Sequence, residues 1–330
     1  MNLEEVARRA GVSIATASRV LNNAPRVRAA TRSRVMSIVE KLNYHPNLHA
    51  RSLAGGKSRS IGLIVSNIEN PFFQDIYIAV EAAARADGYE IILSNTGYCA
   101  ERLETSIRSM VGRRITGLAM IVSEMHPDLV GELNGSGIPV VCYDGGITGQ
   151  NITAIRVNYH GGIDQLASYL YGLGHRRMGI VGHHALMARM NGPLQAAMER
   201  AHRYRDVDVK TAAATDSFQG GRCAARNLLD SHPGLTAMLC LNDSMAIGAM
   251  RGIRDRGLRV PQDISVTGFE DVELAQFCDP ALTSVRVSRA EIAKEVWRAI
   301  VPKEKAALHQ EIVIEPQLVL RSSTAPAKPS

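Results

Sequence analysis

The chain has 330 residues, of which 45% are hydrophobic, and its 38 Lys and Arg exceed its 32 Asp and Glu to give a net charge of +6. It contains no run of about 18 apolar residues, which a membrane-spanning helix needs, and its first residues lack the basic flank and apolar stretch of a secretory signal. The five cysteines are far apart and form no CxxC pair, which argues against a disulfide or zinc framework and indicates a cytoplasmic protein with reduced thiols.

The positive charge is concentrated in the first sixty residues. They carry eleven Lys and Arg against three Asp and Glu, a net charge of +8, whereas the other 270 residues have a net charge of −2. Such a concentration is typical of a domain that binds a polyanion, and nucleic acid is the first candidate. The simpler interpretation is a solvated basic surface that has no partner.

Two short helices are predicted at the start of this basic region. Apolar residues recur at helical spacing over residues 3–10, and Gly11 ends that helix. Ser13 can cap a second helix over residues 14–22, so the pair predicts a helix-turn-helix. The face of the second helix that lies opposite its apolar stripe carries Ile14, Ala15, Ser18 and Arg19. On such a face an Arg can pair with guanine, and small apolar side chains can meet thymine methyl groups.

A third amphipathic helix is predicted over residues 29–42, and a shorter one follows it. Pro46 interrupts the chain, Asn47 can cap a helix over residues 48–54, and two glycines end it. A helix of about two turns is not stable alone. We therefore expect its folding to depend on a partner, which makes it a candidate conformational relay.

From Ile61 onward, short apolar runs alternate with helical stretches. The predicted strands are 61–65, 91–93, 118–122, 140–142, 180–181, 237–241 and 264–267. This alternation predicts an α/β body of doubly wound parallel sheets. The strands are too many for one sheet, and residues 158–162 fit a crossover between two lobes. A ligand would then bind beyond the carboxyl ends of the strands, in the cleft between the lobes.

The basic region resembles the DNA-binding head of the LacI (lactose-repressor/galactose-repressor) family. The resemblance lies in VARRAGVS (6–13), ATASRVLN (15–22), TR (31–32) and LNYHPN (42–47). It implies that the second helix lies in the major groove of DNA and that the hinge helices of two subunits pair in the minor groove. It implies base contacts by Ile14, Ala15, Arg19 and Arg26, contacts with phosphates or the groove wall by Ser13, Thr16, Ser18, Asn22, Thr31 and Tyr44, and hinge contacts by Asn47, His49, Ala50 and Leu53.

Two positions of the head carry further expectations. Leu53 would act as a wedge that partly unstacks a base step and kinks the DNA; the alternative is an ordinary leucine of helix packing. Arg28 stands where the family has a small hydroxyl residue that caps the third helix. This departure puts that cap in question and lets Arg28 reach a phosphate instead.

The body resembles the periplasmic sugar-binding fold that this family uses as an effector sensor, so the resemblance covers about residues 2–321. Its motifs are NPFF (70–73), GHRR (174–177), NDSMAIG (242–248), VPQDISV (260–266), GFED (268–271) and PALTSV (280–285). The implied domains are a head (1–46), a hinge helix and linker (47–60) and a body (61–321). Within the body, one lobe would comprise 61–158 with 288–320, and the other 159–287.

Six residues at the matching cleft positions are candidates for effector binding: Phe72, His183, Arg189, Asn242, Glu270 and Arg289. An aromatic ring, a forked guanidinium, an amide and a carboxylate together suit a small polyhydroxy ligand. Glu270 replaces the usual aspartate of the family, and Arg289 adds a cation that would favour an anionic effector. Phe72 can instead be a core residue and Asn242 a helix cap. His183 and its neighbour His184 lack a third ligand at suitable spacing, so we expect no metal site.

The sequence contains no GxSxG, P-loop, GxGxxG or HExxH motif, so we expect neither an enzyme nor a cofactor. A sugar-binding protein of the transport type is the alternative, but it would need a signal peptide and no basic head. We therefore interpret the chain as a transcriptional regulator, in the first instance a repressor. It would be a homodimer that binds a pseudo-palindromic operator in double-stranded DNA and responds to a sugar-like effector. Residues 322–330 are polar and rich in proline, so disorder is expected there.

Overall fold

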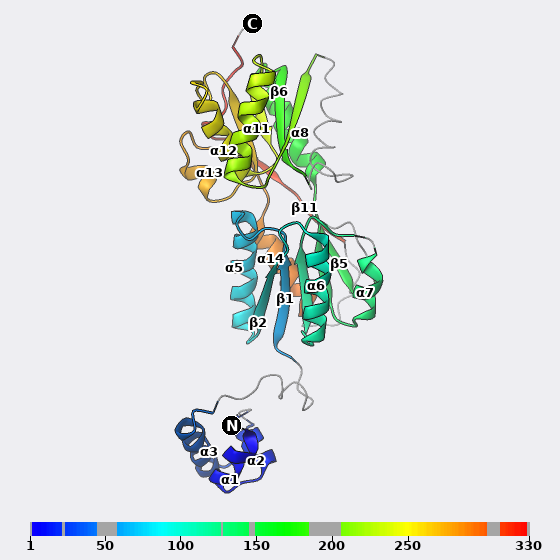
Figure 1. Ribbon diagram of the computed structural model, residues 1–330, viewed down its shortest axis with the longest axis vertical. Coiled ribbons are helices and arrows are strands. Elements are labelled where there is room, and N and C mark those ends of the chain that lie inside the picture. The colour runs from blue at the N-terminus through cyan, green and yellow to red at the C-terminus, as the bar shows by residue number, and fades with distance from the viewer. Residues whose placement is uncertain are drawn as a thin grey trace. The chain divides into compact units, whose positions relative to one another are not determined.

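The computed structural model of the chain divides into two compact units, Met1–Ser58 and Arg59–Ser330, which we call the head and the body (Figure 1). It describes residues 2–21, 24–44, 58–126, 128–144, 149–184, 206–301 and 311–328. In these segments no helix is both long enough and apolar enough to span a membrane. The architecture is mixed α/β, with N-terminal helices followed by two lobes built on parallel sheets.

The described part of the head contains α1 (Leu3–Ala10), α2 (Ile14–Leu21) and α3 (Ala29–Lys41). The side chain of Asn2 accepts a hydrogen bond from the Glu5 N–H, and Gly11 ends α1 with a positive φ of 63°, a conformation that glycine adopts without steric cost. Its small core contains Val6, Ala7, Ala10, Ala17, Val20 and Val35. The predicted helix-turn-helix is thus confirmed, with its apolar stripe inward.

The first lobe of the body, which we call the N-lobe, contains six parallel strands in the order β11-β5-β4-β3-β1-β2. Their bounds in that order are Glu311–Ile314, Ile152–Val157, Val140–Tyr143, Gly117–Ile121, Ser60–Val65 and Glu90–Asn95. The register sets Ile61 beside Ile91 on one side and Gly117 on the other.

Helices cover both faces of this sheet, as the strand sequences require. Alternate residues of β1 point to opposite faces: Leu63 belongs to the apolar cluster of α5 (Pro71–Ala86) and α14 (Arg289–Ile300), and Ile64 to that of α6 (Ala100–Gly112) and α7 (Leu129–Gly135). Both faces of β1 are therefore buried, which explains why its sequence is a continuous apolar run rather than an alternating one.

The second lobe, the C-lobe, has its own six-stranded sheet in the order β12-β10-β9-β8-β6-β7, with β12 antiparallel to β10. The bounds in that order are Gln317–Val319, Thr283–Arg286, Ser265–Glu270, Ala237–Cys240, Arg177–His183 and Asp208–Ala214. In its described residues the helices are α8 (Tyr159–Gly172), α11 (Phe218–Ser231), α12 (Asp243–Arg254) and the short α13 (Leu274–Phe277).

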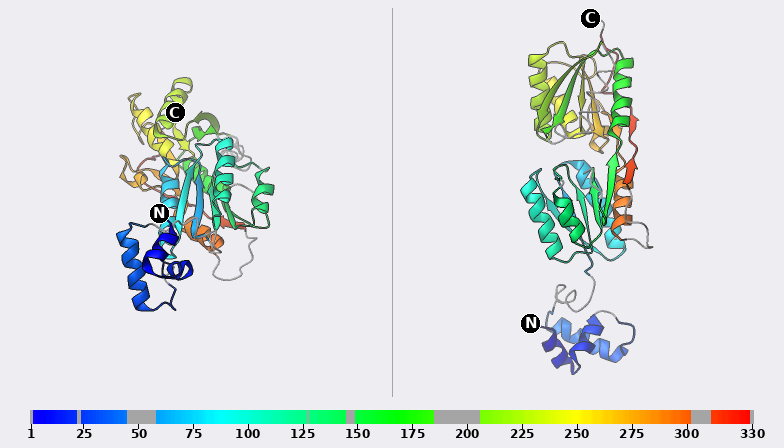
Figure 2. Two further views of the ribbon diagram at one scale, coloured as in Figure 1. Left: turned by 60° about the horizontal axis from the view of Figure 1, so that its bottom comes forward. Right: turned by 90° about the vertical axis from the view of Figure 1, so that its right-hand side faces the viewer.

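The chain passes between the two lobes three times, and the last passage corrects a predicted boundary. The sheets show that the return to the N-lobe comprises α14 and β11, which ends at Ile314, whereas β12 already pairs with β10 of the C-lobe. Figure 2 shows this final segment, in red, running from one sheet to the other. The assignment of 288–320 to the N-lobe is therefore wrong for residues 317–320. Gln165 of α8 binds the segment between β11 and β12, because its side chain donates to the carbonyl of Pro316 and accepts the N–H of Leu318.

The expected disorder after residue 321 is also wrong for residues 322–328. Ser323 is fully buried, its hydroxyl accepts the N–H of Thr283 at 2.8 Å, and it donates to the carbonyl of Val266 at 2.6 Å. Further along, the carbonyl of Ala325 lies 3.0 Å from a ring nitrogen of His175, and Ala327 N–H donates to the carbonyl of Leu173. This segment is ordered by hydrogen bonds rather than by apolar side chains, so its polar composition concealed it.

Candidate functional sites: the face of helix α2 and the cleft between the lobes

The outer face of α2 presents the side chains that were predicted to read bases. Ile14 is 46% exposed, and Ala15 and Arg19 are exposed as well, while Ala17 and Val20 of the same helix are buried. The hydroxyl of Ser13 accepts the Thr16 N–H at 3.2 Å and so caps the helix. An apolar residue this exposed at the start of a helix, beside an exposed Arg, suits a surface that enters a DNA groove.

The basic residues of the head fall into two groups. Arg8 and Arg9 both pair with Glu5, at 2.7 and 2.6 Å, and these bonds hold the pKa of Glu5 below its ordinary value. Arg32 is held inside the head, where it donates to the carbonyls of Val20 and Ala24. Among the described residues of the head, the second group is exposed and makes no ion pair with an acid: Arg19, Arg26, Arg28, Arg34 and Lys41. This second group is charge that a polyanion can meet without first displacing an acidic partner.

The remaining residues of the head that were predicted to contact DNA differ in their exposure, and some lie outside the described residues. Ser18, Thr31 and Tyr44 are half-buried, and Tyr44 packs against the head core. Arg28 precedes α3 without a side-chain capping bond, as its departure from the family pattern suggested. Asn22, Asn47, His49, Ala50 and Leu53, together with the predicted hinge helix, lie outside the described residues.

The body contains a cavity where the carboxyl ends of strands from both sheets meet. Its walls are formed by residues at or after the carboxyl ends of β1, β2, β3, β4 and β5 in the N-lobe and of β7, β8, β9 and β10 in the C-lobe. The lining residues are Asn70, Phe72, Phe73, Tyr98, Ser123, Tyr143, Asp144, Tyr159, Asp216, Leu241, Asn242, Phe269, Glu270 and Val287. Parallel α/β sheets bind ligands at this end, so the cavity is the candidate effector site.

Aromatic rings form much of the cavity wall. Phe72 follows Pro71 at the start of α5, and its ring lies 6.0 Å from that of Tyr143, while the rings of Tyr159 and Phe269 are 5.7 Å apart. Phe72 is only 2% exposed, so it is both a core residue and part of the lining. Such ring faces suit the apolar face of a sugar or another flat ligand.

A carboxylate that the sequence reasoning missed joins the two lobes across the cavity. Asp216 of the C-lobe accepts hydrogen bonds from Asn67 at 3.0 Å and from the Tyr98 hydroxyl at 2.5 Å, and both donors belong to the N-lobe. Asn70 of the N-lobe and Asn242 of the C-lobe also donate to it, at 3.3 and 2.6 Å. Asp216 follows β7, a strand that was not predicted, so its place at the cleft could not be foreseen.

Glu270 lies in a strained turn at the end of β9. Its φ is +102° and that of Asp271 is +53°, a backbone region that non-glycine residues rarely adopt. The oxygen Oε2 of Glu270 is buried and has no hydrogen-bond partner. Burial, together with the nearby carboxyls of Asp216 and Asp243, raises the pKa of Glu270 well above its ordinary value. Both features are typical of a group whose partner is a ligand.

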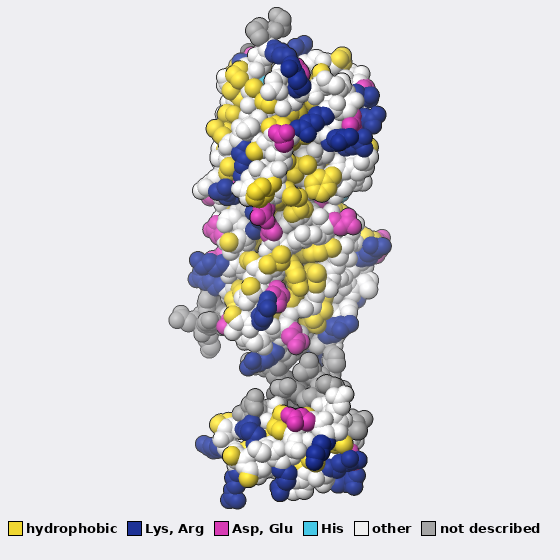
Figure 3. All heavy atoms as spheres, turned by 90° about the vertical axis from the view of Figure 1, so that its left-hand side faces the viewer, with side chains coloured by type: hydrophobic (Ala, Val, Ile, Leu, Met, Phe, Trp, Pro, Cys, Tyr) yellow, Lys and Arg dark blue, Asp and Glu magenta, His cyan; other side chains and the backbone are white. Residues whose placement is uncertain are grey.

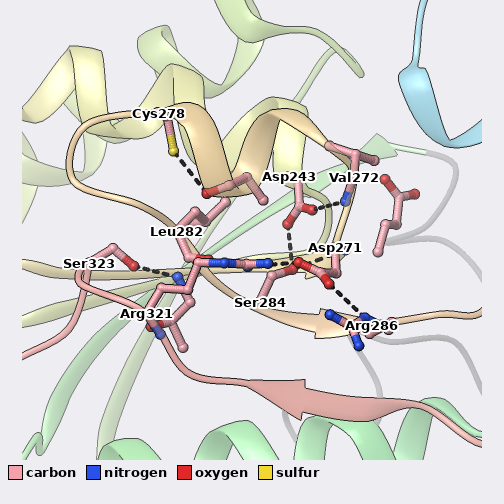
Figure 4. A network of polar contacts seen from close by, with 12 residues as sticks. Asp243, Asp271, Val272, Cys278, Leu282, Ser284, Arg286, Arg321 and Ser323 are labelled. Carbon is pink, nitrogen blue, oxygen red and sulfur yellow. Dashed lines mark hydrogen bonds and ion pairs between the residues drawn. The ribbon is translucent and has the colours of Figure 1, made fainter.

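A polar network beneath this turn keeps it in place, as Figure 4 shows. Asp243 accepts the Val272 N–H at 2.7 Å and the Ser284 hydroxyl at 2.6 Å. Arg286 and Arg321 both pair with the carboxylate of Asp271, at 2.8 and 2.7 Å. Burial raises the pKa of Asp243 to about 7. The network holds the backbone on both sides of Glu270 and so aims its side chain at the cavity.

Two other predicted cleft residues, Arg289 and His183, are not among the residues that line the cavity. Arg289 does not line the cavity, because its guanidinium pairs with Asp75 at 2.9 Å and donates to the carbonyl of Glu270 at 2.7 Å. His183 lies beside the cavity, with its ring centroid 4.0 Å from that of Tyr98, and burial lowers its pKa. Arg189 lies outside the described residues. Among the described residues, no cluster of three or more His, Cys, Asp or Glu is placed to hold a metal.

Comparisons with known proteins agree with this division into a head and a body. Residues 2–47 match the family of bacterial regulatory proteins, lacI family, and residues 167–324 match the periplasmic binding protein-like domain. The ribose operon repressor of Haemophilus influenzae is 31% identical over 97% of this chain and 98% of its own. The HTH-type transcriptional repressor PurR of Vibrio campbellii is 32% identical, with the same coverage of both chains.

A solved structure matches the whole fold as well. The lac repressor dimer bound to operator and the anti-inducer ONPF superposes with a TM-score of 0.82 at 26% identity, covering 98% of this chain and 99% of its own. The helix-turn-helix head, the two parallel-sheet lobes and the full-length similarity to repressors lead to one conclusion: the chain belongs to the LacI family of bacterial regulatory proteins and is a DNA-binding transcriptional regulator controlled by an effector.

Proposed function

We propose that the protein is a homodimeric repressor that binds a pseudo-palindromic operator and that a sugar or sugar derivative, bound in the cleft between the lobes, controls its affinity for DNA. The observation that carries this proposal is the cavity itself: it combines aromatic rings with carboxylate and amide groups from both lobes. The relative named as a ribose operon repressor supports a sugar-like ligand. As a DNA-binding regulator, the protein would act in the cytoplasm, and we assign it no catalytic role.

In the head, we propose that α2 enters the major groove of the operator. Arg19 would read a guanine, and Ile14 and Ala15 would contact thymine methyl groups. Arg26 extends this reading surface, and the exposed Arg28, Arg34 and Lys41 serve phosphates, which carry no sequence information. The operator-bound lac repressor, which shares this fold, supports the assignment.

In the body, effector binding would act through the separation of the lobes. Asp216 already bonds to donors from both lobes, so a ligand that competes for these groups changes how tightly the cleft closes. In a dimer, lobe closure would change the separation of the two hinge segments and hence the fit of both heads to DNA. By thermodynamic reciprocity, DNA must change the affinity for the effector by the same factor.

A second copy of the chain would cover an exposed apolar face of the body. Ile78 of α5 is 60% exposed, and Leu274 and Phe277 of α13 are 46% and 72% exposed. Both helices lie on the side of the body that faces the viewer in Figure 3, where apolar side chains gather in both lobes. Large exposed apolar groups on a folded surface indicate a protein partner, and the dimer among the structural relatives makes a second copy the occupant we propose.

The decisive experiment selects the DNA first and the effector second. Full-length protein is used to enrich operator sequences from random duplexes, and the enriched duplex is then titrated in the presence of sugars, beginning with ribose. We expect a palindromic sequence and at least one sugar that shifts the operator affinity. Replacement of Asn242 by Ala should abolish the shift. Enrichment of no sequence, or an Asn242→Ala protein that still responds, would contradict the proposal.

A further inference from the structure

The chain passes between the two lobes along one side of the body. The three passages follow β5, β10 and β11. β11 and β5 are the first two strands at one end of the N-lobe sheet, and β12 and β10 are the first two at the corresponding end of the C-lobe sheet. The right-hand view of Figure 2 shows these segments together on one side. That side is the hinge in any movement of one lobe against the other, and the opposite side is the one that can open.

Asp216 lies on the side of the cleft that can open. It follows β7, the last strand at the other end of the C-lobe sheet, and β1 and β2 are at the matching end of the N-lobe sheet. Its carboxylate accepts hydrogen bonds from Asn67, Asn70 and Tyr98, which follow β1 and β2, at 3.0, 3.3 and 2.5 Å. The ring centroid of Tyr98 also lies 4.0 Å from that of His183 at the end of β6. Asp216 therefore joins the lobes on the side where the described chain makes no passage.

The amide donors that surround Asp216 are held in place by their own oxygens. Oδ1 of Asn70 accepts the Phe72 N–H at 3.0 Å and caps α5, and Oδ1 of Asn242 accepts the Met245 N–H at 2.8 Å and caps α12. Each of these amides is thus left with its nitrogen directed at Asp216. Both are buried, so without an acceptor at this place their N–H groups would be unsatisfied.

The cavity beside these bonds is too small for a sugar. It encloses about 30 Å³, which is room for about two water molecules, since one needs roughly 10–15 Å³. Sites that enclose small molecules commonly have about 300–1,000 Å³. Because the walls come from both lobes, a ligand can gain this space when the lobes separate. Separation on the side opposite the hinge breaks the bonds of Asp216 to the N-lobe.

From these observations we propose that Asp216 is a latch. It holds the lobes together on the side opposite the hinge, and an effector binds by replacing it as the acceptor of the amide and phenol donors. The hydroxyl oxygens of a sugar can accept the same hydrogen bonds. The latch therefore opposes effector binding, and the bound effector keeps the lobes apart. That Asp216 holds the lobes together follows from its contacts, whereas its displacement by an effector rests on the proposed function.

Hydrogen–deuterium exchange of the full chain, followed by mass spectrometry with no sugar added, tests the latch directly. Asp216→Ala removes the acceptor, and Tyr98→Phe keeps the ring but removes one donor of the N-lobe. In Asp216→Ala we expect the amides of 66–73 and 241–246, which border the cleft, to exchange about tenfold faster or more. Tyr98→Phe should produce a smaller increase in the same segments.

A matched control is available on the same strand. Asp208 is exposed at the opposite end of β7, where it pairs with Lys210 at 2.9 Å. Asp208→Ala should exchange as the parent does in both segments. In all three variants the amides of α6 and α8, which make no bond to Asp216 among the described residues, should keep the exchange rates of the parent and so report that the lobes remain folded.

Operator titrations then test whether the latch takes part in regulation. Without sugar, the operator affinity of Asp216→Ala should differ from that of the parent by about fivefold or more. The change should have the direction in which D-ribose, or another sugar that acts on the parent, moves the parent. This sign separates a latch from a residue that only binds the effector, because loss of such a residue leaves operator binding without sugar unchanged.

Two kinds of result would overturn the proposal. Exchange that matches the parent in both Asp216→Ala and Tyr98→Phe would show that these bonds do not hold the lobes together, and an equal increase in Asp208→Ala would show that the effect is not specific. Operator affinity that is unchanged in Asp216→Ala, or that moves against the effect of the sugar, would exclude the latch from regulation. If no sugar acts on the parent, the proposed function fails, while the exchange result still decides whether the latch exists.

Discussion

Replacement of the buried Ser323 by Ala tests whether the C-terminal segment contributes to the stability of the C-lobe. Its hydroxyl bonds to the N–H of Thr283 and to the carbonyl of Val266, so it links β10 to β9 at a point from which water is excluded. The substitution leaves a buried N–H without an acceptor, which costs about 1–3 kcal/mol, and it removes one further hydrogen bond worth about 1 kcal/mol. We expect the free energy of unfolding to fall by about 2–4 kcal/mol, a large part of the roughly 5–15 kcal/mol typical of a domain.

The neighbouring Ser322 provides a matched control, because it is exposed and its N–H bonds to the carbonyl of Ala281 through the backbone alone. Urea unfolding of the full chain, followed by far-UV circular dichroism, would compare Ser323→Ala and Ser322→Ala with the parent. The fluorescence of Trp297, the single tryptophan, would report the N-lobe. A loss below about 0.5 kcal/mol for Ser323→Ala, within the range of ordinary surface substitutions, would refute the reasoning, as would equal losses for both variants.

Three further predictions concern the head, the dimer and the polar network. Arg19→Ala should weaken binding to the enriched operator by about tenfold or more and binding to random DNA much less; equal losses in gel-shift titrations would count against base reading. Phe277→Ser should raise the dimer dissociation constant by about tenfold or more, and a dimer that is unchanged in analytical ultracentrifugation would exclude α13 from the interface. The pKa of Asp243 is raised to about 7 in the folded protein. Between about pH 4 and pH 7 its carboxyl is therefore protonated in the folded protein and ionised in the unfolded chain, so the free energy of unfolding should fall as the pH rises through this range. Asp243→Asn should flatten this slope in urea titrations, and an identical slope in both proteins would reject the assignment.

The strands of the body were predictable where an apolar run fills a sheet that is buried on both faces. β1 and β3 meet this condition, and both were found to within a residue or two at each end. β7 and β10 do not. β7 lies at a sheet edge and is largely half-buried or exposed, and β10 reads Thr-Ser-Val-Arg, whose buried hydroxyls bond to other segments.

The cleft was predictable only in part, for a similar reason. Phe72, Asn242 and Glu270 stand in motifs that resemble a known family, and the structure places all three on the cavity wall. Asp216 gives no such local signal. Its importance comes from Asn67 and Tyr98, which lie 149 and 118 residues away in the sequence, and only the fold brings them together. For Arg289 the charge of the side chain was evident from the sequence, but its partner, Asp75, which turns it away from the cavity, was not.

The order in which the chain passes between the lobes has a consequence for its synthesis. The N-lobe sheet is completed only when β11 and α14 have been made, and the C-lobe needs β12 and Ser323, which come later still. We therefore expect that neither lobe of the body completes its hydrophobic core until nearly the whole chain has left the ribosome. The head, by contrast, has its own core within the first 58 residues, so we expect it to fold while the body is still incomplete. We therefore expect each newly made molecule to pass through a stage at which its head is folded but its body cannot yet respond to an effector.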